Sequence, residues 1–384
     1  MNLLVCNMKK TNVAFCLRDM QIGGVESVLI RTLDELSKRK DINIFVITYV
    51  DIHEDIYKKY FKEHPDITLC SLYPCRWFGT KLPHFFLWRL VAHFMRDVYH
   101  GFKRVFVLQK FKNIDVFIDY HDFCFAKELK HVKWAKKIAW FHSSLNVFIK
   151  RKFINQLKFY DKFVVLTDDC AKDLKSLYTN NGDKIIRIYN PIDIETIRNM
   201  ANKEAVISGQ YFCSVSRLSG DKDIKTLLNG FDLFYKKNKD SDVKLVLVGS
   251  GDKAEEYKKY ANSLKSSKQI IFVGPQKNPF VYMKYAIVNI LSSYGEGLPT
   301  VLIESAVVGT LNIASNCKYG PSEILLNGYG GMLFEPGNDA QLAKCMDDVY
   351  NKNVDIKKMV RKMEDSLDRF EPKKIVLEII SLFF

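Results

Sequence analysis

Short apolar runs rich in Val, Ile and Phe alternate with longer amphipathic segments along almost the whole chain. The short runs have the length and β-branched content of buried strands, and the longer segments repeat apolar residues with the 3.6-residue period of a helix. Strands that alternate with helices favour parallel sheets that are covered on both faces. The sequence therefore predicts an α/β chain with doubly wound parallel sheets.

The apolar runs and periodic segments set approximate limits for these elements. The runs predicted as strands are Asn12–Leu17, Asn43–Tyr49, Asp115–Tyr120, Lys137–Phe141, Lys162–Thr167, Ile185–Tyr189, Tyr211–Val215, Lys244–Val248, Gln269–Val273, Val288–Leu291 and Leu311–Ala314. The segments predicted as helices include Glu26–Lys38, Asp168–Tyr178, Ile224–Lys237, Ala254–Leu264 and Thr300–Val308.

The alternation is interrupted once, near the middle of the chain. A strand ends at the turn Tyr189–Asp193, and a polar stretch follows before a second strand–helix series starts at Tyr211. A chain of 384 residues is longer than one hydrophobic core usually serves. We therefore predict an N-terminal domain over 1–191, a C-terminal domain over 192–366, and a C-terminal helix over 367–384 that returns to the N-terminal domain.

The net charge and the cysteines of the chain limit which partners it can bind and in which cellular compartment it can work. The net charge of +14 predicts an anionic partner, namely nucleic acid, an anionic membrane face or a phosphorylated substrate, and solubility in a lysine-rich proteome is the alternative. No nucleic-acid-binding motif is present, so nucleic acid is not expected. Nine scattered cysteines match no zinc or disulfide framework, which fits the cytosol. We expect neither a signal peptide nor a transmembrane helix.

Two carboxylates stand close together in the stretch SSYGEGLPTVLIESA, residues 292–306. Glu296 lies in a glycine turn, and Glu304 lies inside the helix that follows, with seven residues between them. The glycines allow a close approach of the backbone to a ligand, and the N–H groups of a helix that starts at Pro299 suit an anion. Two acids that contact opposite ends of one elongated ligand are the hypothesis, and a turn acid beside a solvent-facing helix acid is the alternative.

Two cations follow another predicted strand in the stretch VSRLSGDKD. Arg217 and Lys222 are five positions apart, and a helix is predicted to start directly after them. A planar guanidinium and a point-charge ammonium at the carboxyl end of a strand suit a diphosphate. Two ordinary surface cations in a basic protein explain the pair equally well.

Weaker signals stand at the ends of other predicted strands. His142 ends a strand and could hydrogen-bond a sugar or a phosphate, although a lone histidine at such a place is more often structural. Loops with glycine or proline could present backbone groups to a ligand. The residues concerned are Gly23, Gly24, Gly249, Gly251 and Pro275. The pair Gly23–Gly24 lacks the spacing of a dinucleotide fingerprint.

Together these motifs resemble the retaining GT-B glycosyltransferases of family four, which transfer a sugar from a nucleotide donor. The resemblance covers nearly the whole chain, is strongest over 211–336 and loosest over about 50–115, and its most specific part is the pair Glu296 and Glu304 within EGLPTVLIES. It implies two Rossmann-like doubly wound domains that face each other across a cleft. Such folds bind ligands outside the carboxyl ends of their strands.

The resemblance also implies a role for each residue. Glu296 would hold hydroxyls of the donor sugar, Glu304 would bind the ribose, and Arg217 and Lys222 would neutralise the diphosphate leaving group. His142 would lie near the sugar and the β-phosphate. Backbone N–H groups would complete a phosphate cradle without a metal or other cofactor, and the donor-binding residues would be Gly23, Gly24, Gly249, Gly251, Pro275, Gly297, Leu298, Pro299, Thr300 and Glu304. The transferred sugar would keep its anomeric configuration.

The Gly-Glu-Gly-Leu-Pro loop departs from the Phe-Gly pair that follows the first Glu in many members of the family. This variant looks like enzymes that build bacterial surface glycans from UDP-sugars. We therefore expect a hexose or N-acetylhexosamine to be transferred, with a UDP-sugar favoured as the donor. A non-catalytic nucleotide-sugar-binding scaffold on the same fold is the alternative.

The acceptor side of the prediction rests on basic segments. Segment 81–112 has seven Lys or Arg residues against one acid, and segment 127–158 has nine against one. In the first, apolar residues recur at helical spacing between Arg89, Arg96, Lys103 and Arg104, which predicts either contact with an anionic membrane or a core helix with a basic face. With the family resemblance, we expect a peripheral enzyme on the cytoplasmic face of the membrane that extends a polyprenyl-diphosphate-linked glycan.

Overall fold

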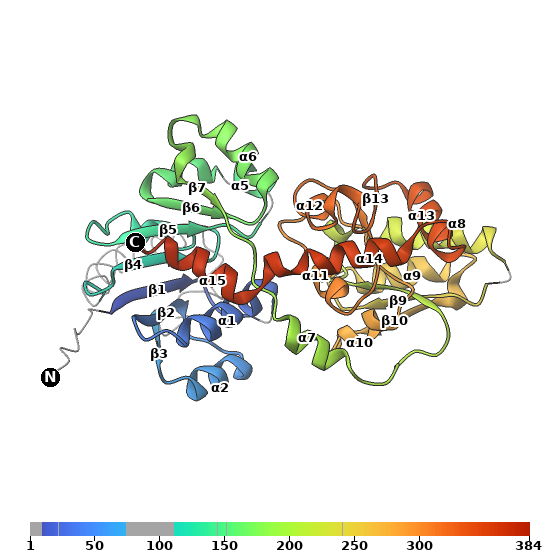
Figure 1. The fold of residues 1–384 in the computed structure, drawn as a ribbon, viewed down its shortest axis with the longest axis horizontal. Coiled ribbons are helices and arrows are strands. Elements are labelled where there is room, and N and C mark those ends of the chain that lie inside the picture. Colours follow the sequence, from blue (N-terminus) through green and yellow to red (C-terminus); the bar gives the residue numbers. More distant parts are fainter. Residues whose placement is uncertain (1–9, 22, 74–110, 144, 151, 240) are drawn as a thin grey trace, which may run out of the picture. The chain divides into compact units, whose positions relative to one another are not determined.

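The computed structural model describes residues 10–21, 23–73, 111–143, 145–150, 152–239 and 241–384 (Figure 1). The chain forms two compact units. Unit 1 runs to Val165 and also includes Leu174–Ile188 and Val376–Phe384, and unit 2 comprises Leu166–Asp173 and Tyr189–Ile375. The domain limits predicted after residues 191 and 366 remain predictions.

Unit 1 is built on a seven-stranded sheet with the strand order β3-β2-β1-β4-β5-β6-β7, and all its pairings are parallel. The strands are β1 (Thr11–Leu17), β2 (Ile42–Val50), β3 (Ile67–Tyr73), β4 (Val116–Asp119), β5 (Lys136–Trp140), β6 (Lys162–Val165) and β7 (Ile185–Arg187). The helices are α1 (Gly24–Ser37), α2 (Asp55–Glu63), α4 (Ala126–Leu129), α5 (Leu145–Lys150), α6 (Asp168–Leu177), which starts in unit 2, and α15 (Pro372–Ser381), which ends in unit 1.

A buried carboxylate marks the carboxyl end of β4. Asp119 is fully buried and accepts hydrogen bonds from the Tyr160 hydroxyl at 2.6 Å and from the backbone N–H of Phe125 at 3.0 Å. Burial raises the pKa of Asp119 to about 7, and the bonds from Tyr160, Cys124 and Phe125 only partly oppose this effect.

This raised pKa predicts a pH-dependent stability. Between about pH 4 and pH 7 folded unit 1 keeps Asp119 protonated while the unfolded chain ionises, so the free energy of unfolding falls as the pH rises. We expect the wild type to lose stability relative to Asp119→Asn across this interval, as measured by urea unfolding at a series of pH values. Parallel stability curves for the two proteins would contradict the assignment.

Unit 2 contains a six-stranded parallel sheet with the strand order β10-β9-β8-β11-β12-β13. The strands are β8 (Tyr211–Val215), β9 (Lys244–Val248), β10 (Ile270–Gly274), β11 (Val288–Leu291), β12 (Asn312–Ser315) and β13 (Met332–Phe334). The helices are α7 (Ile194–Ala201), α8 (Ile224–Lys237), α9 (Ala254–Asn262), α10 (Phe280–Lys284), α11 (Thr300–Val307), α12 (Pro321–Ile324), α13 (Asp339–Tyr350) and α14 (Ile356–Asp365).

Helices cover both faces of this second sheet. Along β8, Phe212 packs into a cluster with residues of α8, α9 and α13, whereas its neighbours Tyr211 and Cys213 pack into a second cluster that includes Tyr282 of α10. Successive side chains of a strand point to opposite faces, so two apolar clusters require cover on both sides. The predicted α/β fold with doubly wound parallel sheets is confirmed.

Two strands were not predicted from the sequence. β3 and β13 are edge strands of their sheets, and each pairs with one neighbour only. β13 has three residues, and Leu69 of β3 is 37% exposed. The other strands lie within two residues of their predicted limits at each end. None of the helices in the described ranges has the length and apolar content needed to cross a membrane.

Candidate active site

The strongest contact among the predicted site residues joins two loops of unit 2. Lys222 ends a short 3₁₀ turn, Gly220–Lys222, after β8, and Glu296 lies in the loop after β11, the strand next to β8. The Lys222 ammonium donates to Glu296 Oε1 at 2.5 Å, and the side chains are only 15% and 10% exposed. A cation and a carboxylate predicted from separate motifs therefore lie together at the carboxyl ends of adjacent strands, where ligands of such sheets bind.

Further hydrogen bonds tie the two loops together. The Ser292 hydroxyl donates to the Lys222 carbonyl oxygen at 2.9 Å, and the backbone N–H of Tyr294 donates to the Asp221 carbonyl oxygen at 3.0 Å. After the turn, Asp223 has a left-handed φ of 44° and caps α8 by accepting from the Thr226 N–H at 3.3 Å. The position of Lys222 is thus set from both sides by the backbone.

Arg217 lies on the outer side of this turn. Its guanidinium is 3.6 Å from the Asp221 carboxylate, and its side chain is 75% exposed. Although burial acts in the opposite direction, a hydrogen bond from Ser219 and the charges of Lys222 and Arg217 hold the pKa of Asp221 below its usual value. Arg217 therefore lies beside the turn that carries Lys222, with its side chain largely open to solvent.

The helix after the Glu296 loop starts without a side-chain cap. α11 begins at Thr300, and Pro299 stands at the N-cap rather than at the first helical position that the sequence predicted. Leu298 is buried, which fixes the chain just before the helix, and Glu304 lies five residues into the helix, partly buried. Uncapped N–H groups at this place can donate hydrogen bonds to an anion.

Gly320 supports the same loop and was not predicted from the sequence. Its φ is +96°, and a Cβ at this position would lie 2.4 Å from Pro299 Cδ and 2.9 Å from the Gly297 carbonyl oxygen. A side chain here would push the loop away from its position. The positive φ is invisible in a single sequence, because a lone glycine does not reveal its conformation.

The glycines after β9 have a packing role. A Cβ on Gly249, whose φ is +140°, would lie 1.9 Å from the Ser216 carbonyl oxygen, and a Cβ on Gly251 would lie 2.3 Å from the Leu218 carbonyl oxygen. Both glycines let this loop lie directly on the backbone that leads to Lys222. Their role in donor binding stays a prediction, as does that of Pro275, which is exposed after β10.

The predicted site residues Gly23, Gly24 and His142 belong to unit 1, and their surroundings are those within unit 1. Gly23 is the N-cap of α1 and Gly24 its first residue. His142 follows β5, and its backbone N–H donates to Asp122 Oδ1 at 2.9 Å. Burial lowers the pKa of the His142 imidazole to about 4, Asp122 opposes this shift, and His121 adds to it.

His142 is therefore neutral at physiological pH. Its Nε2 atom is buried and has no hydrogen-bond partner among the described residues. A neutral imidazole with one unpaired nitrogen can bond a ligand hydroxyl or phosphate oxygen. Arg89, Arg96, Lys103 and Arg104, the predicted membrane residues, lie outside the described residues.

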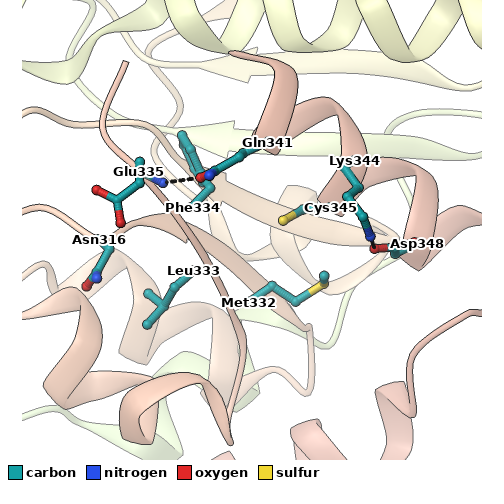
Figure 2. Close-up of a pocket in the computed structure, with 9 residues that line it drawn as sticks. All are labelled: Asn316, Met332, Leu333, Phe334, Glu335, Gln341, Lys344, Cys345 and Asp348. Atoms are coloured by element: carbon teal, nitrogen blue, oxygen red, sulfur yellow. Dashed lines mark hydrogen bonds and ion pairs between the residues drawn. The ribbon is translucent and has the colours of Figure 1, made fainter. Parts of the chain in front are cut away.

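A cavity of about 470 Å³ lies along β13 and α13, and neither Lys222 nor Glu296 lines it (Figure 2). Its polar groups largely bond one another, since the Glu335 N–H donates to Gln341 Oε1 at 2.8 Å and Lys344 pairs with Asp348 at 2.5 Å. The lining residues are Asn316, Met332, Leu333, Phe334, Glu335, Gln341, Lys344, Cys345 and Asp348. None of them belongs to the predicted site, so we do not assign this cavity to the donor.

Residues 198–366, which carry the ion pair, match the family of glycosyl transferases group 1. The fold is that of solved GT-B enzymes: Anabaena Alr3699/HepE in complex with UDP superposes with a TM-score of 0.74 at 16% identity, covering 97% of this chain and 99% of that chain. Residues 198–366 therefore carry a group 1 glycosyl transferase region, and the chain as a whole has the GT-B fold.

Two bacterial proteins are among the relatives that this chain resembles in sequence. An uncharacterized glycosyltransferase of Haemophilus influenzae is 30% identical over 56% of this chain and 60% of its own length. A Campylobacter jejuni α-1,4-N-acetyl-D-galactosaminyltransferase, named for the acceptor GalNAc-α-(1→4)-GalNAc-α-(1→3)-diNAcBac-PP-undecaprenol, is 24% identical over 96% of this chain and 97% of its own. Five curated relatives align over only 43% to 66% of their own length.

Proposed function

We propose that this glycosyltransferase moves a hexose or an N-acetylhexosamine, with retention of configuration, from a nucleotide-diphosphate sugar to a glycan on polyprenyl diphosphate. A UDP-sugar is the favoured donor. The observation that carries the proposal is the largely buried ion pair between Lys222 and Glu296 at the carboxyl ends of β8 and β11. This pair supplies a cation for a leaving diphosphate and an acceptor for sugar hydroxyls in one place.

The charges of the site account for the proposed step. Lys222 and Arg217 would neutralise the negative charge that develops on the diphosphate as its bond to the sugar breaks. The N–H groups at the start of α11 would add to this stabilisation, so we propose that transfer needs no metal. The acceptor hydroxyl would attack from the face that the diphosphate leaves, and the leaving phosphate oxygen would take its proton. The neutral His142 would hydrogen-bond the donor sugar.

The relatives support the class of donor and acceptor. HepE was solved with UDP, and the name of the C. jejuni relative gives an acceptor linked through diphosphate to undecaprenol. A polyprenyl chain stays in the bilayer, so the enzyme has to work at a membrane surface. We propose peripheral association with the cytoplasmic face, through basic residues that attract anionic lipid.

Nucleotide release from a panel of UDP- and GDP-sugars, with and without a lipid-linked acceptor mimic, tests this function. We expect one donor to release its nucleotide in an acceptor-dependent way, with the sugar added in the α configuration and no loss of activity in EDTA. Nucleotide-sugar binding without release from any donor would instead support the non-catalytic scaffold. Release that EDTA abolishes would overturn metal independence alone.

A further inference from the structure

The proposed function assigns Glu296 to the donor sugar but leaves open what orients its carboxylate. Ser293 lies three residues earlier in the same loop and is fully buried. Its hydroxyl donates to Glu296 Oε1 at 2.5 Å, the same oxygen that accepts from Lys222. Among the described residues no group hydrogen-bonds Oε2 of Glu296, so two donors fix one oxygen and leave the other available.

Ser293 is itself held in place from the next strand. The hydroxyl of Ser315, the last residue of β12, donates to the Ser293 carbonyl oxygen at 2.6 Å. Ser315 is also fully buried. Ser315 therefore holds the backbone of Ser293 against β12, and the hydroxyl of Ser293 in turn holds Glu296. The sheet, rather than the glycine turn, sets the position of these two hydrogen bonds.

We infer that Ser293 is a positioning residue that presents Glu296 Oε2 to the hydroxyls of the donor sugar. The loop needs such a device because Gly295 flanks Glu296 and has open space around it, with no atom within 4 Å of an added Cβ. A glycine in open space does not restrain the backbone. The inference rests on the proposed function, because it gives Ser293 its role through the donor sugar.

The affinities of Ser293→Ala for UDP and for a UDP-sugar distinguish a residue that positions Glu296 from one that only supports the fold. Glu296 is proposed to touch the sugar and not the nucleotide, so Ser293→Ala should weaken binding of a UDP-sugar about fivefold while leaving binding of UDP unchanged. The removed bond is charge-assisted, so the kcat of acceptor-dependent release should fall about tenfold to a hundredfold. Calorimetric titration of UDP and of the panel's best UDP-sugar, together with the release assay, measures these effects.

Control variants make the result specific. Ser305 is equally buried and donates its hydroxyl to the Thr310 carbonyl oxygen, away from Glu296, so Ser305→Ala should leave both affinities and kcat unchanged. Ser293→Thr, which restores the hydroxyl, should recover most of the lost rate. In a Glu296→Gln background the Ser293→Ala change should no longer alter UDP-sugar binding, because residues that act as a unit are not additive.

Three results would overturn the inference. They are equal weakening of UDP and UDP-sugar by Ser293→Ala, no weakening of either, and an effect of Ser293→Ala that persists in the Glu296→Gln background. Failure of the proposed function gives a different pattern, since the wild type would then release no nucleotide while binding can still be measured. A wild type that binds no nucleotide sugar would overturn both.

Discussion

Glu296→Gln should lower acceptor-dependent nucleotide release about a thousandfold, the scale of a preorganised charged contact in a buried site. Glutamine keeps the volume of the side chain but removes its charge. The amide also places an N–H₂ group where Lys222 and Ser293 both donate at 2.5 Å, or else turns it toward the sugar. In either orientation no charged oxygen faces the donor hydroxyls, and Lys222 loses its counter-charge.

The Glu296→Gln change should lower the rate of the reaction and leave the stability of the fold unchanged. Release is measured with the donor that the wild type uses, and the melting temperature is recorded for each protein. Glu335→Gln makes the same chemical change at an exposed carboxylate after β13, beside the separate cavity, and should leave release unchanged. A Glu296→Gln enzyme that retains a tenth or more of the wild-type rate would remove Glu296 from the reaction.

Much of the fold could be predicted because buried parallel strands leave a clear pattern. β8, β9 and β11 are short, mostly apolar runs in the middle of their sheet, and the structure gives them the predicted limits. Of the four edge strands, β7 and β10 were predicted, whereas β3 and β13 were not. β3 has an exposed side at Leu69 and β13 has only three residues, so neither presents a long buried apolar run.

The residues of the candidate site also fall into those that the sequence predicted and those that it did not. Lys222 and Glu296 could be predicted because their residue types stand at the ends of predicted strands. Ser293 and Gly320 could not, since a serine beside another serine and a lone glycine carry no signal of a 2.5 Å bond or of a positive φ. Their roles depend on which backbone segments come together in space, and a single sequence does not contain that information.

Gly249 shows how the structure changes the meaning of a predicted residue. The sequence presented it as a donor-binding glycine after a strand. The structure adds a constraint within the protein, because a Cβ would lie 1.9 Å from the Ser216 carbonyl oxygen and the φ of +140° is strained for any other residue. Both costs fall on the loop that leads to Lys222, so the fold itself requires glycine here.

Gly249→Ala should therefore destabilise unit 2 by about 4 kcal/mol, from overpacking against rigid backbone and from the unfavourable φ. For a unit of this size that corresponds to a melting temperature about 10 °C lower, which calorimetry can measure. Gly274→Ala is the matched control, because its φ of +73° is also positive but no atom lies within 4 Å of the added Cβ. It should cost about 1 kcal/mol. If Gly249→Ala melts with the wild type and only loses donor affinity, Gly249 serves the ligand and not the packing of the loop.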